Sequence, residues 1–196
     1  MGREFPGPLF RAADDLSKLS GSVVSENAGS PSMVILTAEM KRVVEQQRLG
    51  FVATVCADGT PNLSPKGTTA VWDDHHLIFA NIRSPGTLEN LRHNPHVEVN
   101  VVDPFLRKGY RFKGVGSIVE SGPLYEQLLA FYRERGSQHA IREIVMIEVH
   151  TAQPIDSPAY DLGLTEEEVR DRMERYYQSL RTRSGPDFSE HTREGR

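Results

Sequence analysis

The spacing of apolar residues divides the chain into helix-like and strand-like segments. Met40, Val43 and Val44 fall on one helical face. Thr37 precedes them and is a residue type that commonly caps helices, whereas Gly50 is expected to end the helix. Beyond Gly50 the period of the pattern changes to the alternation that is typical of half-buried strands.

This alternation predicts six strands. They cover about residues 51–56, 62–72, 77–80, 97–101, 110–118 and 144–149. Turns at Asp58-Gly59 and at residues 73–75 join the first three, which are therefore expected to be consecutive antiparallel neighbours. Six strands with few helices predict a mainly β fold, a small antiparallel barrel with flanking helices.

Three further helices are predicted by their start signals. Ser84 followed by Pro85 opens a short helix, and Pro123 opens another. Thr165 and Glu168 form the capping box of the last helix. The pattern divides the chain into a flexible extension of residues 1–32, one domain of residues 33–183 and a flexible tail of residues 184–196.

The composition narrows the possible partners and location. The 196 residues are 38% hydrophobic, which suits one soluble domain, and the net charge of −4 argues against nucleic-acid binding. The lone Cys56 cannot form an internal disulfide, and no apolar stretch is long enough to cross a membrane. His75 and His76 lie in a predicted turn without further ligands, so no metal site is expected. We therefore expect a cytoplasmic protein that binds neither nucleic acid nor membrane.

Residues 79–91 run from a strand through a turn into a helix. The start of a helix has free N–H groups and the positive end of the helix dipole, and it therefore binds phosphate. Arg83, Ser84 and Thr87 add a cation and two hydroxyls. The alternative interpretation, which is the more common arrangement for this spacing, is that Ser84 only caps the helix and Arg83 is solvated.

A second candidate segment precedes this one in the sequence. Ser64 and Lys66 share one face of a predicted strand and can project together toward a ligand. Gly67 would let a flat ring approach the backbone. The alternative is an edge strand interrupted by Pro65, with Lys66 in water.

Several segments then resemble a known family in their order along the chain. They include Ser64-Pro-Lys-Gly67 and Phe79-Ala-Asn-Ile-Arg-Ser84, together with residues 49–55, 58–62 and 91–101. The sequence over about residues 37–180 is similar to FMN-binding split-barrel proteins of the pyridoxamine 5′-phosphate oxidase family. The resemblance implies a six-stranded antiparallel split β-barrel with flanking helices.

The resemblance also implies a homodimer that holds FMN in the groove between its subunits. The residues expected to bind FMN are Ser64, Lys66, Gly67, Thr68, Asn81, Ile82, Arg83, Ser84, Thr87 and Arg111. Arg111 would reach the flavin of the other subunit, while the phosphate would be held by Arg83, Ser84 and Thr87. No residue is assigned a catalytic role.

The chain departs from the authentic oxidase at two places. That enzyme has an Arg-Lys pair at the phosphate turn, where this chain has Gly86-Thr87, and its C-terminal Trp has no counterpart because Trp72 is the only tryptophan. We therefore expect an FMN-dependent oxidoreductase that acts on another small molecule, with NAD(P)H as a candidate donor. The alternatives are a flavin carrier or sensor without turnover and a reductase that uses the deazaflavin F420.

Overall fold

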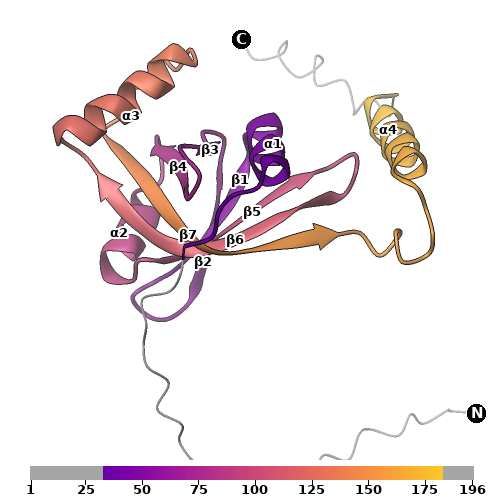
Figure 1. The fold of residues 1–196 in the computed structure, drawn as a ribbon, viewed down its shortest axis with the longest axis horizontal. Helices are drawn as coiled ribbons and strands as arrows, with labels where there is room; N and C mark the ends of the chain where they lie inside the picture. The colour runs from indigo at the N-terminus through magenta and orange to yellow at the C-terminus, as the bar shows by residue number, and fades with distance from the viewer. Residues whose placement is uncertain (1–32, 183–196) are drawn as a thin grey trace, which may run out of the picture. The chain divides into compact units, whose positions relative to one another are not determined.

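The computed structural model describes residues 33–182, so the predicted extension and the predicted tail both lie outside the described residues. Seven strands form one antiparallel sheet in the order β2-β1-β5-β6-β7-β4-β3 (Figure 1). In chain order the elements are α1 (Ala38–Gln47), β1 (Gly50–Val55), β2 (Pro61–Lys66), β3 (Ala70–Val71), β4 (His76–Asn81), α2 (Pro85–His93), β5 (His96–Asp103), β6 (Lys108–Val119), α3 (Gly122–Glu134), β7 (Glu143–Asp156) and α4 (Glu166–Thr182).

The connection between β2 and β3 determines how the sheet curls. These two strands follow each other in the chain but form opposite ends of the sheet. A tight turn joins them, in which the Thr69 N–H donates to the Lys66 carbonyl oxygen at 3.3 Å and the Thr69 hydroxyl donates to the same oxygen at 2.8 Å. The two ends of the sheet must therefore lie close together, which gives an antiparallel barrel that is split between β2 and β3. The predicted fold class is confirmed.

The predicted count of six strands is wrong by one. The expected strand 62–72 is divided into β2 and β3, because the hydrogen bonds of Thr69 turn the chain after Lys66. The strand β2 pairs with β1, and it is β3 that pairs with β4. Ser64 and Lys66 therefore do not lie on a strand beside residues 77–80, although they do share one face of β2, as predicted.

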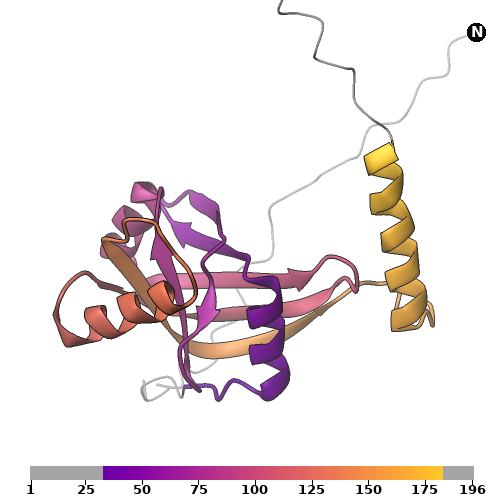
Figure 2. The same cartoon turned by 90° about the horizontal axis from the view of Figure 1, so that it is seen from above.

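Two groups of buried side chains stabilise the barrel. The larger one packs α1 and α2 against the sheet and includes Val44, Leu88 and Phe79. The smaller one packs α3 against β4 and β7 and includes Leu128 and Ile144. The helices α1 and α3 lie at separate positions along the sheet (Figure 2). Each fully buried apolar side chain contributes about 1.5–3 kcal/mol to stability.

The local signals for helix ends are largely confirmed. The Met40 N–H donates to the Thr37 hydroxyl at 3.3 Å at the start of α1. At the start of α4 the Glu168 N–H donates to the Thr165 hydroxyl at 3.3 Å, and the Thr165 N–H donates to Glu168 at 2.8 Å. The predicted end of α1 at Gly50 is wrong, because the helix ends at Gln47 and Gly50 begins β1.

Gly50 is needed inside β1 for a packing reason. A Cβ atom at this position would lie 2.6 Å from the Thr69 hydroxyl oxygen, the group that holds the turn between β2 and β3. This contact is closer than real Cβ atoms allow. The glycine therefore permits the close approach of the turn to β1.

In the part of the chain described here, no helix is long and apolar enough to cross a membrane.

Candidate functional site

Two segments from opposite ends of the sheet meet at a cluster of three hydroxyls and one lysine. The Lys66 ammonium group donates to the Ser64 hydroxyl at 2.8 Å and to the Thr87 hydroxyl at 3.2 Å. The Ser64 and Ser84 hydroxyl oxygens are 3.4 Å apart. We call Ser64, Lys66, Ser84 and Thr87 the hydroxyl–lysine cluster. Both sequence-predicted segments contribute to it, because the curl of the sheet brings β2 to the start of α2.

Lys66 is a buried cation without a counter-charge. Its exposed fraction is 5%, and within residues 33–182 no carboxylate pairs with it. Burial lowers the pKa of the Lys66 side chain to about 8. The ammonium group lies 5.5 Å from the centre of the Phe79 ring, a contact that compensates for part of its lost hydration. An unpaired buried charge is costly, so the cluster is electrostatically suited to receive an anion.

Ser84 does not act as a conventional helix cap. It occupies the N-cap position of α2, but among the described residues no backbone N–H donates to its hydroxyl. The Ser84 N–H donates to Asn81 Oδ1 at 3.1 Å, which fixes the turn. The hydroxyl instead faces Ser64. The interpretation that Ser84 only caps the helix is therefore wrong. Space is open beside Gly86, where an added Cβ would meet nothing within 4 Å.

Arg83 lines a groove that adjoins this cluster. The groove has a volume of about 360 Å³. Its lining residues are Asn81, Ile82, Arg83, Ser84, Pro85, Ala140, Arg142 and Glu143. We call it the arginine groove. Ser84 belongs to both the groove and the cluster, so the two are adjacent at this residue. Sequence reasoning missed Arg142, and only the pairing of β4 with β7 could have indicated it.

Gly67 and Thr68, in the turn after β2, line a second cavity of about 220 Å³. The Thr68 hydroxyl donates to the Ala80 carbonyl and accepts from the Ala80 N–H, both at 3.0 Å, so it holds β4 in place. The Tyr132 hydroxyl donates to the Thr68 carbonyl at 2.9 Å, and burial raises the pKa of this tyrosine. The cavity is also lined by Arg48, Arg135 and His139.

Arg111 is not brought together with the other predicted site residues. Its Nε atom lies 3.0 Å from Glu98 Oε1, and Lys113 Nζ lies 3.4 Å from the other oxygen of the same carboxylate. Along the sheet Arg111 is opposite Asn100, which is opposite Phe51. These residues therefore share one outward face of the sheet, away from the hydroxyl–lysine cluster. The predicted contact with a flavin of the other subunit stays a prediction.

A third cavity, of about 350 Å³, lies on this outward face and was not predicted. Its lining is mostly apolar and includes Ala53, Val55 and Val97, with His96 and His150 at its edge. His150 Nε2 is 2.7 Å from Glu148 Oε1, which fixes the ring. No sequence pattern indicated this cavity, because its residues come from four different strands and the loop-facing end of β2.

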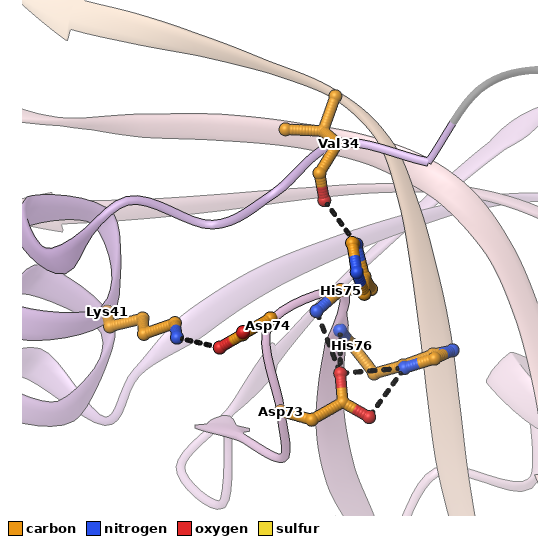
Figure 3. A network of polar contacts seen from close by, with 6 residues as sticks. All are labelled: Val34, Lys41, Asp73, Asp74, His75 and His76. Carbon is orange, nitrogen blue, oxygen red and sulfur yellow. Dashed lines mark hydrogen bonds and ion pairs between the residues drawn. The ribbon is translucent and has the colours of Figure 1, made fainter.

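The histidine pair of the predicted turn is half-buried, and both rings have polar partners. Figure 3 shows the network of residues 73–76, which we call the histidine turn. The His75 ring lies 3.1 Å from the Val34 carbonyl oxygen, and His76 Nδ1 lies 2.8 Å from Asp73. Lys41 forms an ion pair with Asp74. Across residues 33–182, no three His, Cys, Asp or Glu side chains are placed to bind a metal ion together.

Solved structures share this fold. HupZ from Group A Streptococcus is 32% identical to the chain, with a TM-score of 0.57, and the match covers 63% of this chain and 96% of HupZ. An FMN-binding protein from Syntrophomonas wolfei is 13% identical, with a TM-score of 0.54, over 62% of this chain and 87% of its own. HutZ, the heme storage protein from Vibrio cholerae, is 23% identical, with a TM-score of 0.50, over 63% of this chain and 95% of its own. The last two show the fold alone.

A comparison with protein-family models identifies the family. No curated protein sequence matches the chain. The model described as pyridoxamine 5′-phosphate oxidase matches residues 36–163, which is well over half of the chain. This range includes the whole barrel and every residue of the hydroxyl–lysine cluster. The chain therefore belongs to the pyridoxamine 5′-phosphate oxidase family.

Proposed function

We propose that the protein is an FMN-dependent oxidoreductase that acts on a small molecule, and that the hydroxyl–lysine cluster holds the phosphate of FMN. The observation that carries this proposal is Lys66, a buried cation whose partners among the described residues are hydroxyls and a ring. A phosphate would supply the missing negative charge and accept hydrogen bonds from the same groups.

The residues present fit a phosphate in number and chemistry. Lys66 can donate a charge-assisted hydrogen bond, and Ser64, Ser84 and Thr87 can each donate one from a hydroxyl. The start of α2 adds the favourable end of a helix dipole. Arg83 supports the phosphate from the arginine groove. When bound, FMN supplies the transfer of hydride or electrons, and the protein orients it and selects the substrate.

The cavity beside Gly67 is the proposed substrate site. Gly67, which lines this cavity, is the residue after Lys66 in the chain. We therefore propose that the far end of a ligand anchored at the cluster lies near this cavity. Its lining includes Arg48, Arg135 and His139, which suit a substrate with an anionic group. Arg135 also forms an ion pair with Glu45 at 2.8 Å, so Arg48 is the stronger candidate for such a contact. This proposal does not require vitamin B6 as the substrate.

We further propose that the enzyme is a cytoplasmic homodimer. The outward faces of β1 and β2 expose Phe51, Val55 and Leu63, whose exposed fractions are 42%, 37% and 64%. On the same outward face, Asn100 Oδ1 is buried without a hydrogen-bond partner in the described part of the chain. A second subunit would cover the apolar side chains and could donate to this oxygen. It would also place Arg111 at the interface.

The flavin proposal is tested by the absorbance spectrum of the purified protein after incubation with FMN and gel filtration. Retained flavin bands, with bleaching by NADH or NADPH in the absence of oxygen, would support an oxidoreductase. Retained flavin that no donor reduces would indicate a carrier or sensor. Retention of F420 in place of FMN would indicate the deazaflavin reductase.

The homodimer is tested by sedimentation. The native protein should give twice the chain mass, and Leu63→Asp should reduce this mass to that of a monomer.

The third cavity favours a second candidate function, haem binding. Haem is a large apolar ring that proteins hold through an axial histidine, and this cavity combines apolar side chains with His96 and His150. The structural neighbour from Vibrio cholerae is a heme storage protein. Titration with haemin tests this candidate. A Soret band that is lost in His150→Ala but kept in Lys66→Met would replace the flavin proposal.

A further inference from the structure

We propose that the arginine groove is a second anion subsite, which binds a negative group attached beyond the first phosphate of the cofactor. This inference rests on the proposed flavin function, but it replaces FMN as the preferred cofactor by a longer ligand that contains the same phosphate. The ligand class is a flavin or deazaflavin whose phosphate carries a further anionic group. Its two possible sources are the second phosphate of a dinucleotide, as in FAD, and the carboxylates of an acidic tail, as in F420.

Two guanidinium groups converge on the groove from different elements. Arg83 belongs to the turn after β4, and Arg142 immediately precedes β7. These strands are antiparallel neighbours in which Asn81 is opposite Glu143, so both arginines lie at the same end of the strand pair. Glu143 also lines the groove, but neither arginine has a carboxylate oxygen within 4 Å in the described ranges. The groove therefore carries excess positive charge.

A single phosphate that is held by the cluster and supported by Arg83 would not use Arg142. The hydroxyl–lysine cluster already offers one cation and three hydroxyls to a phosphate, with Lys66 at its buried end. Ser84 is shared by the cluster and the groove, and Lys66 is not among the residues that line the groove. A ligand anchored at Lys66 can therefore extend past Ser84 to Arg142 only if it continues beyond its phosphate.

The size and chemistry of the groove agree with such a ligand. Its volume of about 360 Å³ lies within the range of small-molecule sites, which is roughly 300–1,000 Å³. The planar guanidinium group binds phosphate and carboxylate through paired hydrogen bonds. Ile82, with an exposed fraction of 37%, adds an apolar surface at the groove. A phosphodiester or a tail carboxylate next to Arg142 would satisfy all of these features.

The test is a set of flavin-fluorescence titrations with FMN, FAD and F420 at fixed salt. We expect FAD or F420 to bind about tenfold more tightly than FMN, since one charge-assisted hydrogen bond is worth that factor or more. Arg142→Gln should abolish this preference and change FMN affinity by less than about twofold. Arg142→Lys should restore part of it, because the charge is kept without the planar fork. Arg172→Gln, on α4, is the charge-matched control and should change nothing.

The outcomes separate this inference from the proposed function. A preference for FAD would assign the groove to a second phosphate, and a preference for F420 would assign it to tail carboxylates. If FMN binds through Lys66 but neither longer ligand gains affinity through Arg142, the second subsite is wrong and the flavin function stands. If Lys66→Met leaves the affinity of all three ligands unchanged, the proposed function itself is wrong.

Discussion

The hydroxyl–lysine cluster and the histidine turn are two polar networks of similar size with different charge balance. In the histidine turn, Asp73 faces His76 and Asp74 faces Lys41. These side chains lie at the surface or are half-buried. In the hydroxyl–lysine cluster, the only charged group is Lys66, which is almost completely buried and surrounded by hydroxyls.

This difference distinguishes a structural network from the proposed binding site. The histidine turn is complete, since each of its charges has an opposite charge or a backbone partner, and it connects the segment before α1 to the start of β4. The cluster is incomplete, since burial penalises a charge that nothing in residues 33–182 neutralises. Removing a charge should therefore lower the free energy of unfolding in the histidine turn. In the hydroxyl–lysine cluster it should leave that free energy unchanged or raise it, and should weaken FMN binding.

The largest expected effect is that of Lys66→Met on FMN affinity. Loss of a charge-assisted hydrogen bond costs about 1.5–3 kcal/mol, which corresponds to a roughly 10- to 100-fold weaker affinity. The free energy of unfolding of the ligand-free protein should be unchanged or higher, because a desolvated charge is replaced by an apolar chain. Fluorescence titration and urea denaturation measure the two quantities.

Lys41→Met is the matched control for this substitution. Lys41 forms an ion pair with Asp74 at the surface, so its removal should lower the free energy of unfolding by less than about 1 kcal/mol and leave FMN affinity unchanged. If the Lys66→Met variant is less stable than the native protein but binds FMN with the same affinity, the proposed difference between the two networks is wrong. Lys66 would then have only a structural role.

The pH dependence of Lys66 should be the next largest effect. Below about pH 8 the side chain is protonated in both folded and unfolded protein, so the cost of burying the charge is fully present. Between about pH 8 and 10.5 the unfolded chain keeps a proton that the folded one has released. The free energy of unfolding of the ligand-free protein should therefore rise in this window, by up to a few kcal/mol.

FMN affinity should change in the opposite direction over the same window. Binding requires the protonated Lys66, so affinity should fall by up to about tenfold for each pH unit above about 8. Titrations on both sides of this pH, in native protein and in Lys66→Met, isolate the contribution of the lysine. Equal pH dependence in both proteins would show that another group titrates.

The histidine turn should respond to Asp73→Ala in its stability alone. Asp73 accepts hydrogen bonds from the N–H groups of His75 and His76 and lies 2.8 Å from His76 Nδ1. Their loss should lower the free energy of unfolding by about 1–2 kcal/mol. FMN affinity of the folded variant should change by less than about twofold. A large loss of affinity would instead connect this turn to the binding site.

The sequence indicated the two segments of the candidate site but not the contact between them. The cap at Thr37 and the capping box at Thr165 depend on residues a few positions apart, and both are confirmed. The two segments of the candidate site were likewise indicated by their residue types. Their contact depends on the order of seven strands, and that order depends on the turn after Lys66, which a side-chain hydrogen bond of Thr69 creates. Alternating hydrophobicity cannot show such a bond.

Arg142 and the contact between the Ser84 and Ser64 hydroxyls were missed for related reasons. Arg142 reaches the groove through the pairing of β4 with β7, whose partners are more than 60 positions apart in the chain. Ser84 before Pro85 matches the pattern of a capped helix, and the pattern correctly located α2. The serine hydroxyl nevertheless faces Ser64, because the curl of the sheet brings a second hydroxyl within reach.

The smallest expected effect is that of Ser84→Ala, and it separates the two roles of a residue at a helix start. An ordinary serine cap contributes about 1 kcal/mol to stability, and its loss does not affect ligand binding. Here no cap hydrogen bond to the Ser84 side chain exists among the described residues, so the free energy of unfolding should change by less than about 0.5 kcal/mol. FMN affinity should fall about two- to tenfold, because one neutral hydrogen bond to the phosphate is lost.

Riboflavin, which lacks the phosphate, is the control ligand for this variant. Its affinity should be the same in native protein and Ser84→Ala if the hydroxyl contacts only the phosphate. Thr165→Ala, at the capping box of α4, is the control for a serine or threonine that does cap a helix, and it should lower stability by about 1 kcal/mol without changing FMN affinity. If Ser84→Ala behaves like Thr165→Ala, Ser84 belongs to the structural networks, and the phosphate must be held by Lys66 and Thr87 without it.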